Sequence, residues 1–138
     1  MYNKMKKCFQ CKEELELSKF YRNKSTKDGY SGICKNCQTE NEKRNNQLAK
    51  EWLNTLKKTC EICDENRSWV LDFHHVDQKD KTLNISYYAI SGTTSFETKK
   101  KKILEEMKKC IVVCANCHRD IHYQEKTGAY QLNKRNKN

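Results

Sequence analysis

The sequence contains little apolar material for its length. Only 36% of its 138 residues are hydrophobic, and the mean hydropathy is −1.09. A chain of this length forms one domain or two small ones, and small domains bury a low fraction of their surface. Something besides apolar burial must therefore stabilise the fold. Disulfides and structural metal ions are the usual means in small domains.

Long apolar runs are also missing. No stretch approaches the roughly 20 consecutive apolar residues of a transmembrane helix, and the N-terminus has no secretory pattern. No basic amphipathic helix with a strong apolar face is present, so no membrane partner is expected. We expect a cytoplasmic protein of a bacterial or phage-infected cell, a compartment in which disulfides rarely persist.

Cysteine, by contrast, is abundant, with nine residues. Eight of them form four Cys-x-x-Cys pairs, which is the spacing of zinc knuckles, although disulfides are the alternative. The pairs predict two structural Zn²⁺ sites of four thiolates each. The expected ligands are Cys8, Cys11, Cys34 and Cys37 at one site, and Cys60, Cys63, Cys114 and Cys117 at the other. The ninth, Cys110, is expected to be a small buried side chain.

The chain is strongly basic, with 28 Lys and Arg against 18 Asp and Glu and a net charge of +10. Residues 60–126 are balanced, with 11 basic and 11 acidic side chains, so the excess lies outside them. A polyanion such as DNA or RNA is the favoured partner, and a solubilising surface is the alternative. The expected DNA contacts are Lys43, Arg44, Lys50, Lys99, Lys100, Lys101, Lys102 and Arg119.

The sequence divides into four segments. Residues 1–40 read as an N-terminal four-cysteine zinc ribbon or knuckle, whose basic and aromatic side chains suit nucleic-acid contact, with a folding cap or a dimerisation piece as the alternative. Residues 41–59 have no glycine or proline and read as a connecting basic helix. Residues 60–126 form the second metal domain. Residues 127–138 read as a basic disordered tail.

Residues 60–126 predict a strand, a loop, a second strand and a helix. The strands are expected at 68–76 and 110–114, and the helix from 116 to about 124; a further helix is expected to begin near Thr94 or Ser95. His118 and His122 would share one helix face and could bind one ion. His74 and His75 point to opposite faces of a strand, so one of them is left free for acid–base work.

These patterns resemble the HNH endonucleases of the ββα-metal fold. The resemblance rests on LDFHHVD with a following lysine, on KCIVVCANCHRDIH and on Cys60-x-x-Cys63, and it covers about residues 60–124. A four-cysteine module ahead of such a core is similar to small phage and restriction enzymes of this family. The fold class implied is a small α+β zinc-stapled protein with a ββα-metal (HNH) nuclease core.

The resemblance implies a site-specific DNA endonuclease that acts on double-stranded DNA. It assigns His74, His118 and His122 as ligands of a catalytic divalent ion (Mg²⁺, Mn²⁺, Ni²⁺ or Zn²⁺) and His75 as the general base, with 5′-phosphate and 3′-hydroxyl products. Cutting both strands would need a homodimer or two successive nicks. The alternative function is a non-catalytic zinc-ribbon protein that binds DNA or RNA.

The family's middle asparagine, which orients the base, has no counterpart at the expected place, where Lys109 and Cys110 stand. Cys110, a backbone carbonyl or Asp72 are the candidates for that role. Asp72 either contacts a ligand histidine from behind or is a solvated carboxylate. Asn116 lies inside a cysteine knuckle, so it either contacts a metal ligand or is part of the turn.

Overall fold

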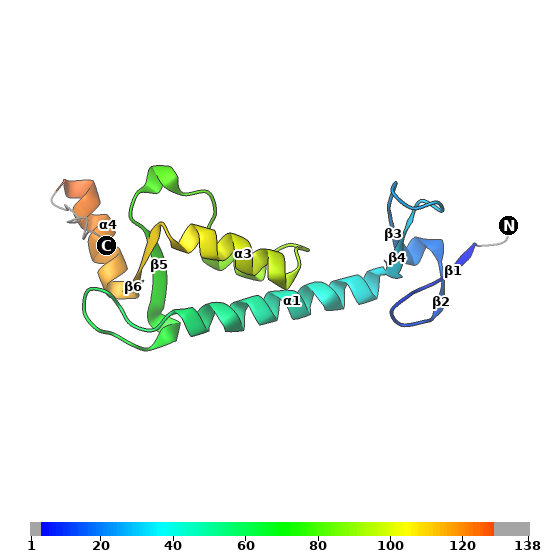
Figure 1. The fold of residues 1–138 in the computed structure, drawn as a ribbon, viewed down its shortest axis with the longest axis horizontal. Helices are drawn as coiled ribbons and strands as arrows, with labels where there is room; N and C mark the ends of the chain where they lie inside the picture. The colour runs from blue at the N-terminus through cyan, green and yellow to red at the C-terminus, as the bar shows by residue number, and fades with distance from the viewer. Residues whose placement is uncertain (1–3, 129–138) are drawn as a thin grey trace. The chain divides into compact units, whose positions relative to one another are not determined.

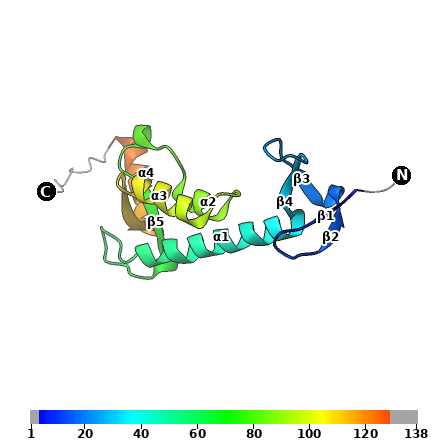
Figure 2. The same cartoon turned by 45° about the vertical axis from the view of Figure 1, so that its right-hand side comes forward.

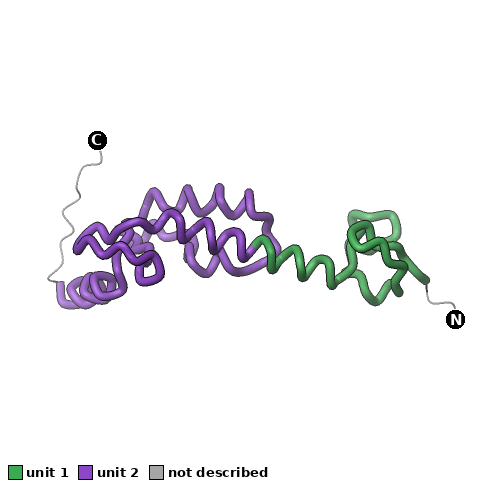
Figure 3. Tube along the Cα trace, turned by 90° about the horizontal axis from the view of Figure 1, so that it is seen from below, with its two compact units in different colours: residues 1–45 green, residues 46–138 purple. Residues whose placement is uncertain are grey.

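A computed structural model describes residues 4–128 of a small mixed α+β protein (Figure 1; Figure 2 gives a second view). The tail expected at residues 127–138 lies outside the described residues from position 129 onward. The chain forms two compact units, unit 1 (residues 1–45) and unit 2 (residues 46–138), coloured separately in Figure 3. No helix in the described part of the chain is long and apolar enough to cross a membrane.

Unit 1 consists of two small antiparallel hairpins and the first half of a helix. The hairpins pair β1 (Met5–Lys7) with β2 (Glu14–Glu16) and β3 (Phe20–Arg22) with β4 (Tyr30–Cys34). A 3₁₀ turn, η1 (Leu17–Lys19), joins them. The buried core of the unit is Phe20 together with the sulfur atoms of Cys8, Cys34 and Cys37. The buried apolar surface of unit 1 is therefore small.

The helix α1 (Lys35–Leu56) is longer than the connecting helix expected at 41–59. It begins six residues earlier because the Cys34-x-x-Cys37 knuckle forms its first turn. Its second half, in unit 2, buries Ala49 completely and Leu53 almost completely. Leu48, the residue before Ala49, is 41% exposed.

Unit 2 is built on one antiparallel hairpin and the helix that follows it. Strand β5 (Leu71–His75) pairs with β6 (Cys110–Cys114), and His74 lies opposite Ile111. Helix α4 (Ala115–Thr127) leaves β6 directly, packs on both strands and ends at Gly128, which has a positive φ of 71°. The strand expected at 68–76 is shorter, because Ser68–Val70 form a 3₁₀ turn, η2.

Two further helices lie between β5 and β6 in sequence. Helix α3 (Phe96–Met107) starts where expected, with the Ser95 hydroxyl accepting a hydrogen bond from the Thr98 N–H. The short helix α2 (Ile85–Ile90) was not predicted, because six residues are too few to show a helical period. Ile85, Ala89 and Ile103 from these helices form a core with the second half of α1. A further 3₁₀ turn, η3 (Gln78–Asp80), follows β5.

Lys99 differs most from its expected role. Its side chain on α3 is fully buried, and its ammonium group donates to the Asn46 side chain at 2.6 Å. It also donates to backbone carbonyls near the end of α2, those of Tyr88, Ala89 and Ser91, at 2.6–3.1 Å. Lys99 therefore joins α3 to α1 and α2, and the prediction that it contacts DNA is corrected.

We expect Lys99→Met to destabilise unit 2 by roughly 3 kcal/mol, because it leaves several buried oxygens without a donor. Chemical unfolding followed by circular dichroism measures this loss. Lys101→Met, an exposed change on the same helix, is the control and should shift stability by less than about 0.5 kcal/mol. Equal unfolding midpoints for the two variants would contradict the structural role of Lys99.

Candidate metal centres

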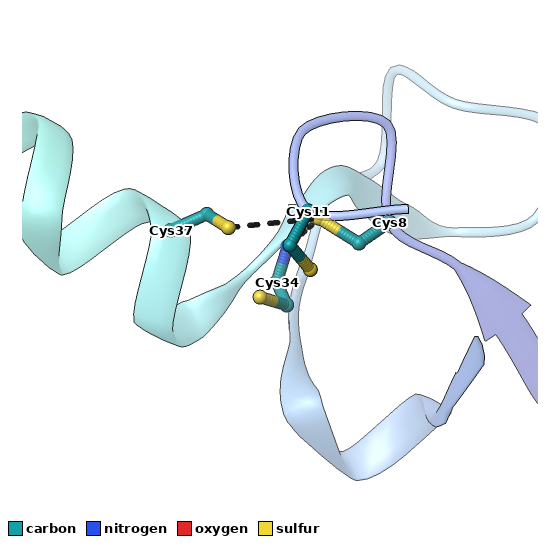
Figure 4. Close-up of side chains that lie close together, drawn as sticks. All are labelled: Cys8, Cys11, Cys34 and Cys37. Carbon is teal, nitrogen blue, oxygen red and sulfur yellow. Dashed lines mark hydrogen bonds between the residues drawn. The ribbon is translucent and has the colours of Figure 1, made fainter. Parts of the chain in front are cut away.

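Four cysteines of unit 1 converge on one point (Figure 4). Their sulfur atoms lie within 4.8 Å of one another, and the Sγ atoms of Cys8 and Cys37 are 3.8 Å apart. Four sulfurs bound tetrahedrally to zinc at about 2.3 Å would be separated by about 3.8 Å. The group Cys8, Cys11, Cys34 and Cys37 could therefore hold a zinc ion, as predicted.

Unit 2 contains a second group of the same construction. Cys60, Cys63, Cys114 and Cys117 also lie within 4.8 Å, with 3.6 Å between the Sγ atoms of Cys63 and Cys114. In both groups the first knuckle is a tight turn followed by a residue with positive φ, Lys12 or Asp64. The second knuckle joins a strand to the first turn of a helix.

The thiols of each group differ in acidity. Burial alone would raise the pKa of Cys8, but the backbone N–H groups around it, led by that of Cys34, lower it to about 6. The same balance lowers the pKa of Cys60 to about 7. Burial and the neighbouring thiols raise the pKa of Cys37 to about 12. Four thiolates can therefore gather only around a cation, and zinc uptake should release protons.

All nine cysteines are free thiols in the structure. The Sγ separations of 3.8 Å between Cys8 and Cys37 and 3.6 Å between Cys63 and Cys114 are well beyond the roughly 2.05 Å of a disulfide. Cys110 belongs to neither group and is 7% exposed in the core of unit 2, as expected. Burial, and then the charge of Glu106, raise its pKa to about 11, so it has little thiolate character.

A third group brings together His74 from β5 with His118 and His122 from α4. The ring centroids are 4.7–5.1 Å apart, and the Nε2 atoms of His118 and His122 are separated by 3.1 Å. His74 is 1% exposed, and neither of its ring nitrogens has a hydrogen-bond partner. Burial lowers the pKa of His74, which keeps the ring neutral with a free lone pair. An orphaned buried imidazole is costly alone but suits a metal ligand.

Two carboxylates hold the outer nitrogens of this group. The Nδ1 atom of His118 lies 3.4 Å from Oδ2 of Asp72, and that of His122 lies 3.0 Å from Oε2 of Glu125. Both contacts leave the Nε2 atoms directed at the shared centre, which is how carboxylates orient metal-binding histidines. Asp72 thus contacts one of the three histidines predicted to be ligands. Glu125 was missed, although its place seven residues after His118 puts it on the same helix face.

His75 lies apart from the three imidazoles. It is on the opposite face of β5, where its Nε2 atom is 2.7 Å from Oε1 of the buried Glu106 on α3. Burial opposes the charge of Glu106, but hydrogen bonds from Thr82, Lys109 and His75 outweigh it and hold its pKa well below the usual range. Glu106 therefore orients His75, in place of the three candidates expected from sequence.

The second ring nitrogen of His75 is available. Within the described part of the chain, Nδ1 makes no hydrogen bond. The residue as a whole is only 5% exposed. Because ionised Glu106 accepts from Nε2–H, Nδ1 is the nitrogen that can accept a proton.

The other expected contact residues lie at the surface. Lys43, Arg44 and Lys50 are exposed on α1, and Arg119 is exposed on α4. On α3, Lys101 and Lys102 are exposed, whereas Lys100 is half-buried and 3.5 Å from Glu97. Asn116 is exposed in the Cys114–Cys117 knuckle, where its backbone N–H contacts the Cys114 sulfur, which is the turn role.

We expect His74→Ala to reduce the metal content of the purified protein from three ions to two. The substitution removes the most buried imidazole of the third group and leaves both cysteine groups unchanged. Elemental analysis after dialysis against Zn²⁺ or Ni²⁺ measures the count. His75→Ala, at the neighbouring position on the other face of β5, should keep three ions. A content of two ions in the unsubstituted chain would refute a metal at the three histidines.

Comparison with protein-family models, with curated proteins and with solved structures finds no match for this chain.

Proposed function

We propose that this chain is a metal-dependent DNA endonuclease of the HNH type, with β5, β6 and α4 as its ββα-metal core. One observation carries the proposal. The imidazoles of His74, His118 and His122 converge, and the buried His74 among them makes no side-chain hydrogen bond. The next residue in sequence, His75, is hydrogen-bonded to the buried carboxylate of Glu106. Hydrolysis of a phosphodiester needs a divalent-ion site and an oriented base, and the two faces of β5 carry candidates for both.

His74, His118 and His122 would hold the ion, with Asp72 and Glu125 orienting the two helix imidazoles. When bound, a divalent ion supplies Lewis-acid polarisation of the phosphate and stabilises negative charge on the leaving oxygen. Three imidazoles favour Zn²⁺, Ni²⁺ or Mn²⁺ in affinity, and Mg²⁺ is the alternative as the working ion. The carboxylates keep the imidazoles in the tautomer that presents Nε2.

His75 would act as the general base. Glu106 accepts the Nε2–H of the imidazole, so Nδ1 takes a proton from water while the water oxygen forms a bond to phosphorus. The bond from phosphorus to the 3′ oxygen breaks, and that oxygen takes a proton from solvent. The products carry 5′-phosphate and 3′-hydroxyl ends. Because His75 is the last residue of β5, a phosphate at this end of the strand could approach both faces of the hairpin.

A non-catalytic nucleic-acid-binding protein with three structural metal ions is the second candidate. It is favoured by the burial of His75 and by the hydrogen bond to Glu106, which together could serve stability alone. The two functions differ in what a substitution at His75 does to DNA. Loss of cleavage with retained binding supports the nuclease, whereas a protein that binds DNA and never cuts it supports the alternative.

The test is incubation of the purified protein with supercoiled plasmid and added Mg²⁺, Mn²⁺, Ni²⁺ or Zn²⁺. We expect nicked or linear products with 5′-phosphate ends for the unsubstituted chain and none for His74→Ala. That variant is a better comparison than a chelator, since a chelator would also attack the cysteine sites. Discrete fragments would indicate site specificity. Plasmid left intact under every ion would overturn the proposal.

A further inference from the structure

Unit 1 carries an open groove that the proposed catalytic site does not use. The groove has a volume of about 730 Å³ and is lined by Leu17, Ser18, Phe20, Tyr21, Arg22, Tyr30 and Lys35. Its lining contains two cations and three aromatic rings but no acidic side chain. These residues come from η1, from the β3–β4 hairpin and from the start of α1. We term it the Arg22 groove.

The cations of the groove are fixed by neighbouring rings. The Arg22 guanidinium lies 4.5 Å from the centre of the Tyr30 ring, and the Lys35 ammonium lies 5.3 Å from the centre of the Tyr21 ring. Lys35 also donates to the Ser18 carbonyl at 2.8 Å. Stacking holds the guanidinium plane, so less rotamer entropy is lost when its N–H fork meets a phosphate.

Neither cation is neutralised in the described part of the chain. Arg22 and Lys35 take part in no ion pair between residues 4 and 128, whereas Lys6 on the same unit is paired with Asp28 at 2.5 Å. Glu16 borders the groove through the Ser18 hydroxyl, at 3.4 Å, but does not line it. The groove is thus a site of uncompensated positive charge, which attracts an anion.

We infer that the Arg22 groove binds the sugar-phosphate backbone of DNA. Proteins commonly bind a nucleic-acid strand with Arg and Lys donors to its phosphates and with exposed aromatic rings against its sugars and bases. Tyr21, whose ring is 47% exposed, adds a face or edge for a sugar or base. The overall charge of +10 favours the same partner. The inference takes its ligand from the proposed function, but it concerns affinity and not hydrolysis.

The test compares two double variants of the full chain that lose the same charge. Arg22→Gln with Lys35→Gln removes the groove cations, and Lys24→Gln with Lys27→Gln removes two exposed cations of the same unit. Both carry His75→Ala so that bound DNA stays intact. Binding of duplex and single-stranded oligonucleotides is followed by fluorescence anisotropy from 50 to 200 mM salt. Metal content is measured to verify folding.

We expect the groove variant to bind DNA about tenfold more weakly at 0.1 M salt, with its salt slope reduced by about two. The control variant should change affinity less than about twofold. Loss with the duplex assigns the groove to double-stranded DNA, and loss confined to the single strand assigns it to an unwound strand. Equal weakening of the two variants overturns the inference. A competition experiment gives a second way to overturn it. If polyglutamate displaces labelled DNA from the chain with Arg22 and Lys35 intact as effectively as unlabelled DNA does, the groove binds any polyanion and the inference fails.

Failure of this inference is distinct from failure of the proposed function. If the chain with His75 intact cuts plasmid while the groove variant binds like the control, only the groove assignment fails. If the groove variant binds weakly but no chain cuts DNA, the groove stands and the nuclease proposal fails.

Discussion

His75→Ala is expected to lower the rate of DNA cleavage by about 10²- to 10⁴-fold, the usual contribution of a general base. Nε2 of His75 is fixed by Glu106 and Nδ1 is left for water, so removing the ring removes the proton acceptor. DNA affinity and metal content should stay within about twofold of the unsubstituted chain. Single-turnover cleavage of a short duplex at saturating protein measures the rate.

Chemical rescue separates a catalytic role from a structural one. Added imidazole should restore part of the cleavage by His75→Ala, because it can occupy the space of the ring and accept a proton. Glu106→Gln should slow cleavage about 10- to 100-fold, since the amide orients the ring less well than the carboxylate does. Both His75→Ala and Glu106→Gln must have the melting temperature of the unsubstituted chain, so that a slower reaction is not caused by unfolding. Unchanged cleavage by His75→Ala would end its assignment as the base.

Removal of zinc is expected to unfold unit 1 completely. Each four-thiolate site supplies on the order of 10 kcal/mol, which is comparable to the whole stability of a small domain. In unit 1 the buried core consists of one phenylalanine and three of the four cysteines that could bind zinc. Hydrogen exchange measured by mass spectrometry should show loss of protection through residues 4–34 after a strong chelator is added.

Unit 2 should respond less uniformly to the same treatment. Its second core, with Ala49, Leu53, Ile85, Ala89 and Ile103, contains no zinc ligand, so α3 should keep part of its protection. The first turn of α4 should lose its protection from exchange, because it contains Cys117 of the cysteine group. Cys110→Ala is the control, because Cys110 is outside both cysteine groups and its loss should leave both zinc ions bound. Full protection of unit 1 without zinc would refute the structural role of the metal.

The grouping of the residues that could bind metal ions could be predicted from spacing alone. A Cys-x-x-Cys pair closes one local turn, and the i, i+4 spacing of His118 and His122 fixes a shared face, so both are encoded within a few residues. The long helix was also visible, but its start was not, because the Cys34-x-x-Cys37 knuckle and not the apolar stripe sets where α1 begins. Helix α2 was too short to leave a pattern.

The missed features depend on contacts between distant segments. Glu106 and His75 are 31 positions apart in the sequence, and neither local sequence contains a pattern that predicts their contact. Lys99 sits in a run of four lysines that looks solvent-facing, yet its position on α3 faces the carbonyls at the end of α2. Burial of a charged side chain is decided by packing between helices, so composition could not separate Lys99 from Lys101.

Cys117 and His118 are consecutive in the first turns of α4, where one belongs to a thiolate group and the other to the imidazole group. An oxidant that expels zinc from the cysteines would therefore loosen the turn that aims His118. If the proposed nuclease function holds, DNA cleavage should then fall under oxidative stress although the proposed reaction uses no sulfur atom. A reductant supplied together with zinc should bring it back.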